Sequence, residues 1–598
     1  MKELRHDIEV LKGIAIITVV FFHLGVLKSG YLGVDAFFVI NGFFLVPSLC
    51  KNISENHFSF LGFLKKRILR LLPLIVVASI ICIVVGYIGM LPDDYENLCQ
   101  TIIASNLCSQ NILSELTVSN YWSSVNDFKP LMHLWYVGIL VEFYIIIPVI
   151  LLVITSLCNV LKWSKMQMIK SMLLLLFSLS IMLFVLPLFS YSEKFYLIPF
   201  RLFELIGGGL VALYLPKQTI HFTNTRIISI VVFSLLVFII CSSLVLFNAN
   251  TLDNTPVIVG SDKLHDDGLI FSRECLLLLT VLLSIVFVNI GGNSIKSSFF
   301  EWFGKRSYSI FIWHQVILAF VRYYYTTNIT FINVLVFIFI TLFVSELSYK
   351  LVERNVRVNT RAFFMWTGLS LFCIFFSGHI YMRAGVVRDV PELGITRGEG
   401  KRGMFSDYCD RIYSFNKDFP DDNGKTNVLV EGISYGRDFC NILLESSLQD
   451  KINLSYVEKW EFGDYHERIK EADVVFTFRS KRSVPEYVWE ALGDTSKIFG
   501  LGPKVYGVNN GQVYSHRGSS DYYSMTVNAI PECIDLNREW REQWGSNYID
   551  FMTPVLEKDN KIRVFTPDHK FISQDCRHLT PFGAKWYASV FDLAKTIN

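Results

Sequence analysis

The sequence has few charged residues for its length, and the two signs of charge almost cancel. Only 18% of its 598 residues are Asp, Glu, Lys or Arg, and the net charge is +2. A chain this close to neutrality has no strongly basic surface, so we expect no nucleic-acid partner. The twelve cysteines show no spacing typical of metal ligands, so no metal site is expected.

The sequence also shows no convincing pattern of a cleavable signal peptide. The first apolar run, 8–22, is short, and no small-residue cleavage site follows it. We therefore expect this run to remain as a membrane helix. The sequence has no short-period repeat and no low-complexity tract.

The chain does have long apolar runs, all of them before residue 384. Runs of about 18 or more apolar residues are long enough to cross a bilayer. The pattern predicts an α-helical membrane domain over residues 1–384, with about eleven spans at 8–26, 33–50, 68–90, 131–155, 171–189, 198–215, 227–247, 274–291, 307–325, 331–349 and 363–381.

Basic residues predict the orientation of this domain. They gather in alternate loops, on the same side as the N-terminus, and the opposite loops carry few. Cytoplasmic loops are the ones enriched in Lys and Arg, so we expect a cytoplasmic N-terminus. An odd number of spans then places the chain after residue 384 outside the cytoplasm.

The remainder of the chain has the composition of a soluble domain. Residues 385–426 are rich in Gly, Pro and charge and predict a linker or wrapping extension. Residues 427–598 alternate strand and helix patterns, which predicts a three-layer α/β/α domain with a parallel sheet. The predicted strands are 427–431, 473–478 and 504–508, and the predicted helices are 436–447, 485–492 and 581–597.

Polar residues in or beside the apolar runs are candidates for function, because burying them in lipid is costly. His23 ends the first run and Asp35 begins the second. A carboxylate near an imidazole can hold its tautomer and raise its basicity. The alternative is a histidine that only meets water at the membrane surface.

Further polar residues occur in pairs. Arg67 and Arg70 are three apart, hence on one helical face, and such a pair suits phosphate recognition. Ordinary anchoring at the cytoplasmic surface is the alternative. Arg201 and Glu204 share the same spacing and could pair with each other. Together with Glu142, they could equally well serve only to fix helix packing.

The soluble domain has its own candidate site. Ser434 follows the first predicted strand and begins a helix, where backbone N–H groups can stabilise an oxyanion. Asp575 and His578, just before the last helix, could supply the acid and base of a triad. A simple helix N-cap is the alternative for Ser434.

Seven segments, in order, resemble the membrane acyltransferase-3 family. They are 5–15 leading to Phe22-His23, 33–43, 63–73, 130–135 with 142–144, 199–204, 303–314 and 348–354. The resemblance implies transfer of an acyl group, usually acetyl, from coenzyme A. The resemblance implies that His23 is the essential histidine of the family. It also implies that Arg67 and Arg70 bind the phosphates of coenzyme A. Asn41 stands where a serine is commoner, and Leu140-Val141-Glu142 replaces the frequent Glu-Glu-Gln.

Residues 427–598 resemble the SGNH hydrolase family. Gly432-Ile433-Ser434 matches its first block, usually Gly-Asp-Ser, and the run 575–581 matches its last block. The resemblance implies Ser434 as nucleophile, His578 as base and Asp575 as its orienting acid. Gly507 and Asn510 are weak candidates for the oxyanion-hole donors. Because Ile433 departs from the pattern, an inactive domain is the alternative.

These resemblances together imply an O-acetyltransferase of the bacterial inner membrane. It would move acetyl from cytoplasmic acetyl-CoA, a substrate and not a bound cofactor, to a hydroxyl of a surface polysaccharide or lipid-linked glycan, for example lipopolysaccharide O-antigen. Peptidoglycan is a second possible acceptor. A glycan transporter or flippase with a glycan-binding tail, or an external esterase on a membrane anchor, would also fit the pattern. Membrane lipid is a partner in every case.

Overall fold

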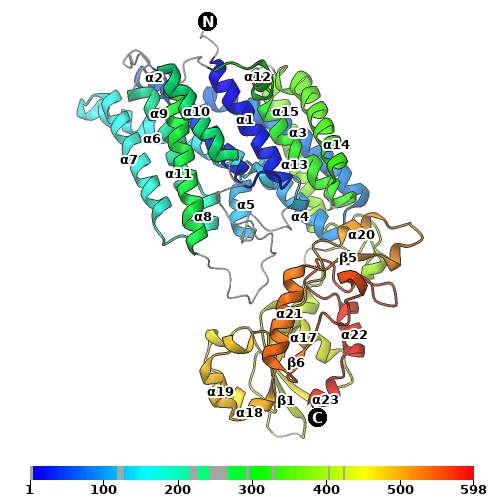
Figure 1. Ribbon diagram of the computed structural model, residues 1–598. Helices are drawn as coiled ribbons and strands as arrows, with labels where there is room; N and C mark the ends of the chain where they lie inside the picture. Colours follow the sequence, from blue (N-terminus) through cyan, green and yellow to red (C-terminus); the bar gives the residue numbers. More distant parts are fainter. Residues whose placement is uncertain are drawn as a thin grey trace.

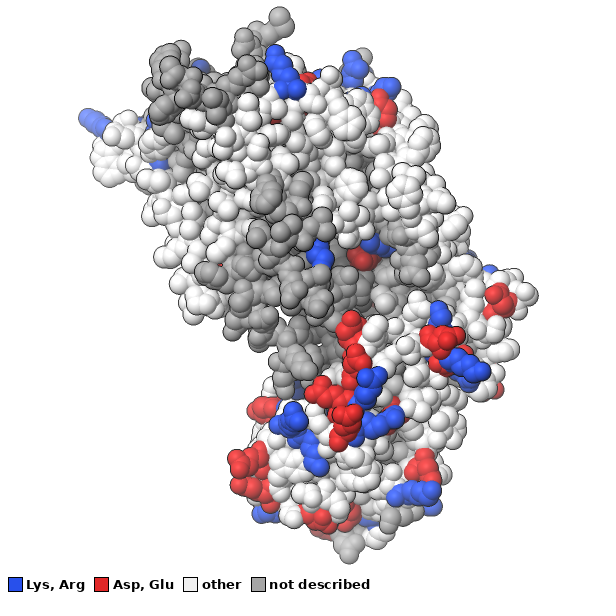
Figure 2. Space-filling model, viewed as in Figure 1, with Lys and Arg blue, Asp and Glu red and all other residues white. Residues whose placement is uncertain are grey.

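The computed structural model describes residues 5–117, 127–214, 225–241, 267–290, 295–325, 330–356, 358–401, 404–421 and 424–597. Figure 1 shows two parts, a bundle of long helices that holds the N-terminus and an α/β part that holds the C-terminus. Over the face shown in Figure 2, the charged side chains gather on the α/β part and near the ends of the bundle. The largely uncharged sides of the bundle are those expected of a surface that faces lipid.

Each of the eleven predicted spans coincides with a helix. These helices are α1 (His6–His23), α2 (Gly33–Ser54), α3 (Phe60–Gly89), α6 (Trp135–Leu161), α7 (Lys165–Val185), α9 (Leu202–Tyr214), α10 (Thr225–Cys241), α11 (Asp267–Ile290), α13 (Ser307–Tyr324), α14 (Phe331–Ser348) and α15 (Thr360–Met382).

Within the described residues, seven helical segments are long and apolar enough to cross a membrane. The exact count of eleven therefore stays a prediction. Four of the eleven helices, α1, α9, α10 and α13, are not among these seven. For two of them the reason is visible, since α9 has only 13 residues and α1 carries Asp7, Glu9 and Lys12. Shorter helices that the apolar pattern did not predict are α4 (Pro92–Asn106), α5 (Gln110–Thr117), α8 (Tyr191–Tyr196) and α12 (Ser298–Lys305).

The α/β part is built on a five-stranded sheet with strand order β2-β1-β3-β4-β6, in which every pairing is parallel. The predicted parallel sheet is thus confirmed, and the SGNH assignment stays a prediction. The strands are β1 (Thr426–Glu431), β2 (Ile452–Val457), β3 (Val474–Thr477), β4 (Ile498–Leu501) and β6 (Tyr548–Ile549), and the main helices are α17 (Ser434–Leu444), α18 (His466–Glu471), α19 (Glu486–Leu492), α21 (Pro531–Trp544) and α22 (Pro581–Val590).

Two expectations for the α/β part were wrong. Residues 504–508 form no strand; the strand is β4, and Gly502-Pro503 ends it, because proline has no N–H for the ladder. The apolar run of 504–508 is instead a buried loop, and its lysine has a partner described below. The closing helix is also broken, since α22 ends at Val590 and α23 (Leu593–Ile597) follows.

The two parts of the molecule touch through α13, α4 and the loop that leads into α20 (Gly511–Ser515). The hydroxyl of Tyr323 donates to Asp94 Oδ2 at 2.8 Å and accepts from the N–H of Leu91 at 2.9 Å. Asn509 of the α/β part reaches the same Asp94 carboxyl at 3.4 Å. This contact is one of those that join the α/β part to the bundle.

Candidate functional site

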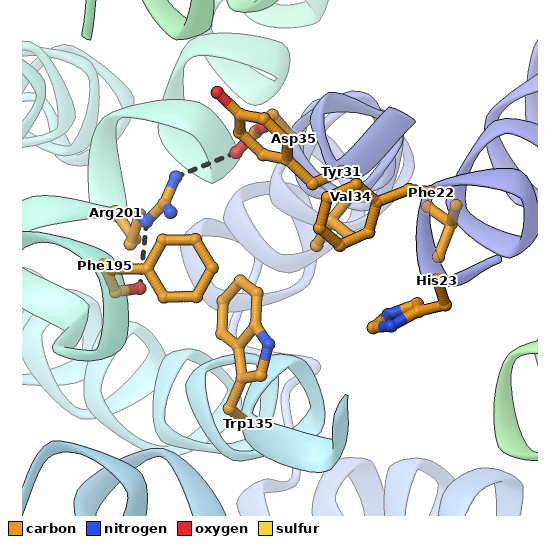
Figure 3. Close-up of a pocket in the computed structure, with 9 residues that line it drawn as sticks. Phe22, His23, Tyr31, Val34, Asp35, Trp135, Phe195 and Arg201 are labelled. Atoms are coloured by element: carbon orange, nitrogen blue, oxygen red, sulfur yellow. Dashed lines mark hydrogen bonds and ion pairs between the residues drawn. The ribbon is translucent and has the colours of Figure 1, made fainter. Parts of the chain in front are cut away.

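A small pocket opens at the end of the bundle where α1 ends and α2 begins. His23 is the last residue of α1, and its ring points toward the pocket in Figure 3. Phe22, Tyr31, Trp135 and Phe195 supply aromatic walls, and Asp35 and Arg201 lie on the side away from His23. The pocket therefore combines an imidazole, an apolar wall and a buried charged group.

The charged group is a closed network around Arg201. Its Nη1 donates to Asp35 Oδ1 and to Glu204 Oε1, each at 2.8 Å, and its Nε donates to the Phe195 carbonyl at 3.1 Å. All three charged side chains are buried. The pairing of Arg201 with Glu204 that their spacing suggested is confirmed.

The expected contact between Asp35 and His23 is not formed, although both residues line the same pocket. Asp35 is hydrogen-bonded to Arg201 instead. A buried guanidinium without carboxylate partners would be very costly, and this demand explains where the Asp35 carboxylate goes. Asp35 therefore holds Arg201 and is not placed to orient the imidazole.

His23 has two other histidines beside it. Its ring centroid lies 5.1 Å from that of His314 on α13, and the His314 centroid lies 5.3 Å from that of His133, just before α6. We call His23, His133 and His314 the histidine cluster. The carbonyl of His23 accepts a hydrogen bond of 2.7 Å from Arg322, which is paired with Asp127. The sequence predicts no site role for His133, and it marks His314 only as a polar residue within a span that could fix helix packing, because neither belongs to a spacing pattern that points to chemistry.

The predicted phosphate-binding arginines are not among the residues that line the His23 pocket. They belong to the first half of α3, which follows the end of α2, whereas His23 lies beside the start of α2. Arg67 stacks over the rings of Phe63 and Tyr144 at 5.3 and 5.4 Å, and Arg70 is exposed.

Among the described residues, no carboxylate forms an ion pair with either arginine. Their guanidinium groups are therefore available to an anionic ligand. Glu142, on α6, accepts a hydrogen bond of 2.9 Å from Asn111. It is placed as a packing contact between α5 and α6 and is not among the residues that line the His23 pocket.

The second candidate site lies on the α/β part, next to the bundle. His578 Nδ1 lies 2.6 Å from Asp575 Oδ2, and the other oxygen of Asp575 accepts from the backbone N–H groups of Arg577 and His578. Because a carboxylate can only accept, Nδ1 carries the proton and Nε2 is left as the base. This is the orientation that the sequence predicted for the pair.

The loop of His578 is tied to the helix that Ser434 begins. Asp438, one turn after Ser434, accepts from the backbone N–H of Leu579 at 3.0 Å and forms an ion pair with buried Lys504. Lys504 also donates to the carbonyl of Arg577 at 2.5 Å. Ser434 and His578 thus come to the same edge, although they share no hydrogen bond in the described structure.

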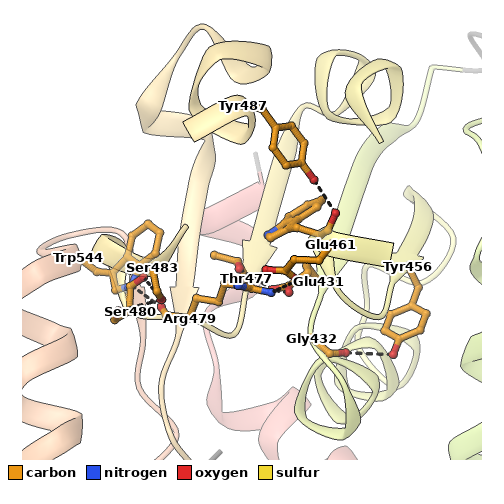
Figure 4. A network of polar contacts seen from close by, with 11 residues as sticks. Glu431, Gly432, Tyr456, Glu461, Thr477, Arg479, Ser480, Ser483, Tyr487 and Trp544 are labelled. Carbon is orange, nitrogen blue, oxygen red and sulfur yellow. Dashed lines mark hydrogen bonds and ion pairs between the residues drawn. The ribbon is translucent and has the colours of Figure 1, made fainter. Parts of the chain in front are cut away.

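The turn that presents Ser434 requires glycine at position 432. Gly432 has φ +143°, and a Cβ there would lie 3.0 Å from that of Phe478. The hydroxyl of Tyr456 donates to the carbonyl of Gly432 at 3.0 Å and so fixes the turn (Figure 4). Ile433, the departure from the SGNH pattern, is part of this same turn.

A polar network supports the carboxyl edge of the sheet beside the turn (Figure 4). Glu431, at the end of β1, accepts from Thr477 at 2.7 Å and from Arg479 at 2.9 Å, and Arg479 also binds Glu461 at 2.8 Å. Ligands of parallel α/β sheets bind at this edge. The network holds β1 and β3 together next to Ser434.

The electrostatics of the pair formed by Asp575 and His578, called the external pair below, suit a base at His578; the name follows the predicted orientation. The negative charge of Asp575 raises the pKa of His578 above its usual value, against the effect of burial. Burial would raise the pKa of Asp575, but His578 and two backbone N–H groups outweigh it, and the pKa is lowered. Asn510, a weak oxyanion-hole candidate, donates its amide to the Ser573 carbonyl at 2.8 Å, and the other candidate, Gly507, packs against Val527.

Comparison with known proteins finds relatives that are named O-acetyltransferases. The chain is 30% identical over 380 residues to a putative O-acetyltransferase of Staphylococcus aureus (strain COL), which is 60% of this chain and 58% of the relative. It is 26% identical over 368 residues to O-acetyltransferase OatA of Staphylococcus aureus (strain NCTC 8325 / PS 47), 58% of this chain and 56% of the relative. The chain thus matches somewhat more than half the length of these relatives.

No solved structure matches the chain. The family model that matches is that of an acyltransferase domain, over residues 5–350. This range contains His23, His133, His314 and both arginines, and it is more than half of the chain. The chain is therefore a member of this membrane acyltransferase family.

Proposed function

We propose that the protein is an integral-membrane O-acetyltransferase. It takes acetyl from cytoplasmic acetyl-CoA and places it on a hydroxyl of a surface glycan, of which lipopolysaccharide O-antigen is the leading candidate. The protein then lies in the bacterial inner membrane, with a cytoplasmic N-terminus and the α/β part outside. Family membership and relatives named O-acetyltransferases support this proposal.

The donor side of the proposal rests on the two ends of α2. Arg67 and Arg70 offer unpaired guanidinium groups at one end, and such groups suit the phosphates of coenzyme A. The pantetheine arm is long and thin, and it reaches along the helices toward His23 at the other end. There the imidazole acts as base for transfer of the acetyl group from sulfur to an oxygen nucleophile.

The acceptor side uses the external pair. The Ser434 hydroxyl attacks the carbonyl of the acetyl group delivered by the bundle while His578 takes its proton. The bond from acetyl to its carrier breaks, His578 gives the proton to the departing carrier atom, and an acetyl ester remains on Ser434. The sugar hydroxyl then attacks this ester and gives its proton to His578, which returns a proton to the Ser434 oxygen. Asp575 holds the His578 tautomer that both steps require.

The observation that carries the proposal is the pair of histidine sites in one chain. One lies in the helical bundle, and the other lies on the α/β part beside it. A transporter needs neither, and an esterase needs only the second. Two sites are what a two-stage transfer requires.

The test is the O-acetyl content of surface glycan from cells with wild type, His23→Ala or Ser434→Ala. Mass spectrometry and NMR are applied separately to purified O-antigen and purified peptidoglycan. We expect both variants to lose the acetyl group. Acetyl missing only from peptidoglycan makes peptidoglycan the acceptor, and normal acetylation in His23→Ala refutes the proposed enzyme.

A further inference from the structure

The histidine cluster contains buried ring nitrogens that lack partners. His133 and His314 are 2% and 0% exposed. Neither nitrogen of His133, nor Nε2 of His314, makes a hydrogen bond to any residue in the described ranges. The carbonyls of Ile312 and Phe311 lie near His133 without hydrogen-bonding geometry. Buried polar atoms are nearly always satisfied, so three unsatisfied nitrogens at one place need an explanation.

One tautomer is fixed by a neighbour. Nδ1 of His314 lies 3.1 Å from the carbonyl oxygen of Ile310, one turn earlier in α13. A carbonyl oxygen only accepts, so Nδ1 carries the proton of the neutral ring. Nε2 of His314 is therefore a bare lone pair, buried and free to accept a proton.

The partner for that lone pair is close. The rings of His23 and His314 are 5.1 Å apart, and those of His314 and His133 are 5.3 Å apart. At such centroid separations a modest ring rotation, or one bridging water, joins the nitrogens of neighbouring imidazoles. The three rings come from α1, α13 and the turn just before α6, so the fold brings them together from distant parts of the chain.

We propose that His314 and His133 form a proton relay for His23. This inference rests on the proposed transfer from acetyl-CoA. As the C–O bond to acetyl forms and the C–S bond breaks, His23 takes the proton of the attacking hydroxyl. The resulting imidazolium shares that proton with Nε2 of His314, and His133 stabilises the charged pair. The proton then returns through His23 to the thiolate, which leaves as coenzyme A thiol.

The charges around the cluster favour a shared, delocalised proton. Arg322, paired with Asp127, donates to the carbonyl of His23, and the Arg201 network with Asp35 lies across the pocket. Among the described contacts, no carboxylate touches a ring of the cluster. With no counter-ion at hand, neutral imidazoles are the groups that can take up part of the charge of His23. His314 and His133 act through His23 and are positioning residues.

The experiment is hydrolysis of acetyl-CoA by the full chain in detergent or membranes. Water stands in for the hydroxyl that attacks acetyl-CoA beside His23, so a failure of glycan transfer does not affect the result. His314→Gln keeps a polar side chain but cannot carry a proton. We expect kcat to fall about tenfold or more, the KM for acetyl-CoA to stay the same, and the acid limb of the pH profile to move.

His133→Gln is the second variant, and we expect a smaller fall in kcat with the KM again unchanged. It replaces His314→Gln in the test if that variant does not accumulate in the membrane. His379→Gln is the matched control, because His379 is exposed on α15. Unchanged kcat and pH profile in both cluster variants, or an equal loss in His379→Gln, would overturn the relay. Relay variants that slow hydrolysis while wild type leaves the glycan unacetylated would instead refute only the proposed acceptor.

Discussion

The two histidine sites, His23 in the bundle and His578 on the α/β part, have different surroundings. His578 is paired with a carboxylate at 2.6 Å, is partly exposed and sits in a short loop. Within the part of the chain that the structure describes, no carboxylate lies at the ring of His23, which is surrounded by aromatic rings and two further histidines. A base that faces water can use a charged partner, since solvent screens the pair. Inside a bundle an uncompensated carboxylate is expensive, and neutral imidazoles suit that site better.

The carboxylates near each site show the same contrast. Asp575 is hydrogen-bonded directly to His578. Asp35 is instead hydrogen-bonded to Arg201, and both line the wall of the pocket. An acid residue close to a histidine in the sequence therefore has no fixed role. What decides its role is whether a buried cation competes for it.

Removing the carboxylate of the external pair is the strongest way to break this comparison. We expect Asp575→Asn to lower glycan acetylation about 100-fold or more, because His578 loses its tautomer. Asp575 raises the pKa of His578, and the base must be neutral, so activity is lost as pH falls through that raised value. Without Asp575 the acid limb should lie at lower pH.

The measurement for this variant is hydrolysis of a small acetyl ester by the full chain across pH. Asp35→Asn is the matched comparison, since it removes a carboxylate from the other site. It should leave the acid limb of ester hydrolysis where the wild type has it. If both variants moved that limb alike, the two sites would not be separate.

The donor end is tested next. We expect Arg67→Ala and Arg70→Ala each to raise the KM for acetyl-CoA about tenfold, the effect of losing a hydrogen bond to a charged group. Hydrolysis of a small acetyl ester by the α/β part should not change. Lys66→Ala is the control, because Lys66 is an exposed neighbour of Arg67. An equal rise in KM for Lys66→Ala would mean that Arg67 and Arg70 act only through the general positive charge of this surface.

Sequence predicted the local part of each site and missed the distant part. Asp575 with His578 and Arg201 with Glu204 are each three residues apart, and both pairs formed as expected. Asp35 and Arg201 are 166 residues apart in the chain, and only the packing of α2 against the start of α9 brings them together. His133 and His314 likewise lie beside His23 only because helices distant in the chain pack together.

The fold shows the same limit. Apolar runs found the helices of the bundle, because length and hydropathy are properties of a single segment. The pattern of residues 504–508 predicted a strand, yet Lys504 is buried in a loop, where it pairs with Asp438 on α17. A pattern of five residues cannot predict a partner that lies elsewhere in the chain. Short soluble segments are therefore predicted less well than long membrane helices.

The contact between the two regions can be broken at one glycine. A Cβ on Gly511 would lie 1.9 Å from the hydroxyl oxygen of Tyr323, so Gly511→Ala must push the α/β part away from α13. We expect glycan acetylation to fall about severalfold, because the loop of His578 moves from its place beside the bundle. Acetyl-CoA hydrolysis and small-ester hydrolysis should each be retained.

Gly398→Ala is the control for this substitution, since a Cβ there meets nothing within 4 Å. Limited proteolysis between the two parts provides a readout that does not depend on activity. If Gly511→Ala lost both partial activities as well, the defect would lie in folding and not in docking.

The smallest expected effect concerns pH at the same contact. Burial, then the charge of Asp575, raises the pKa of Asp93 to about 7, and burial raises that of Asp94 to about 6 despite hydrogen bonds from Tyr323 and Asn509. A carboxyl whose pKa is higher in the docked state takes up a proton on docking, so acid stabilises the contact. The contact should therefore weaken as pH rises from about 5 to 8, and proteolysis between the parts should speed up.

Replacing both Asp93 and Asp94 by asparagine should flatten this pH dependence. If the dependence persists in the double variant, it comes from other groups. The external site would then work best in a window of pH, high enough to free His578 from its proton and low enough to keep the two regions together.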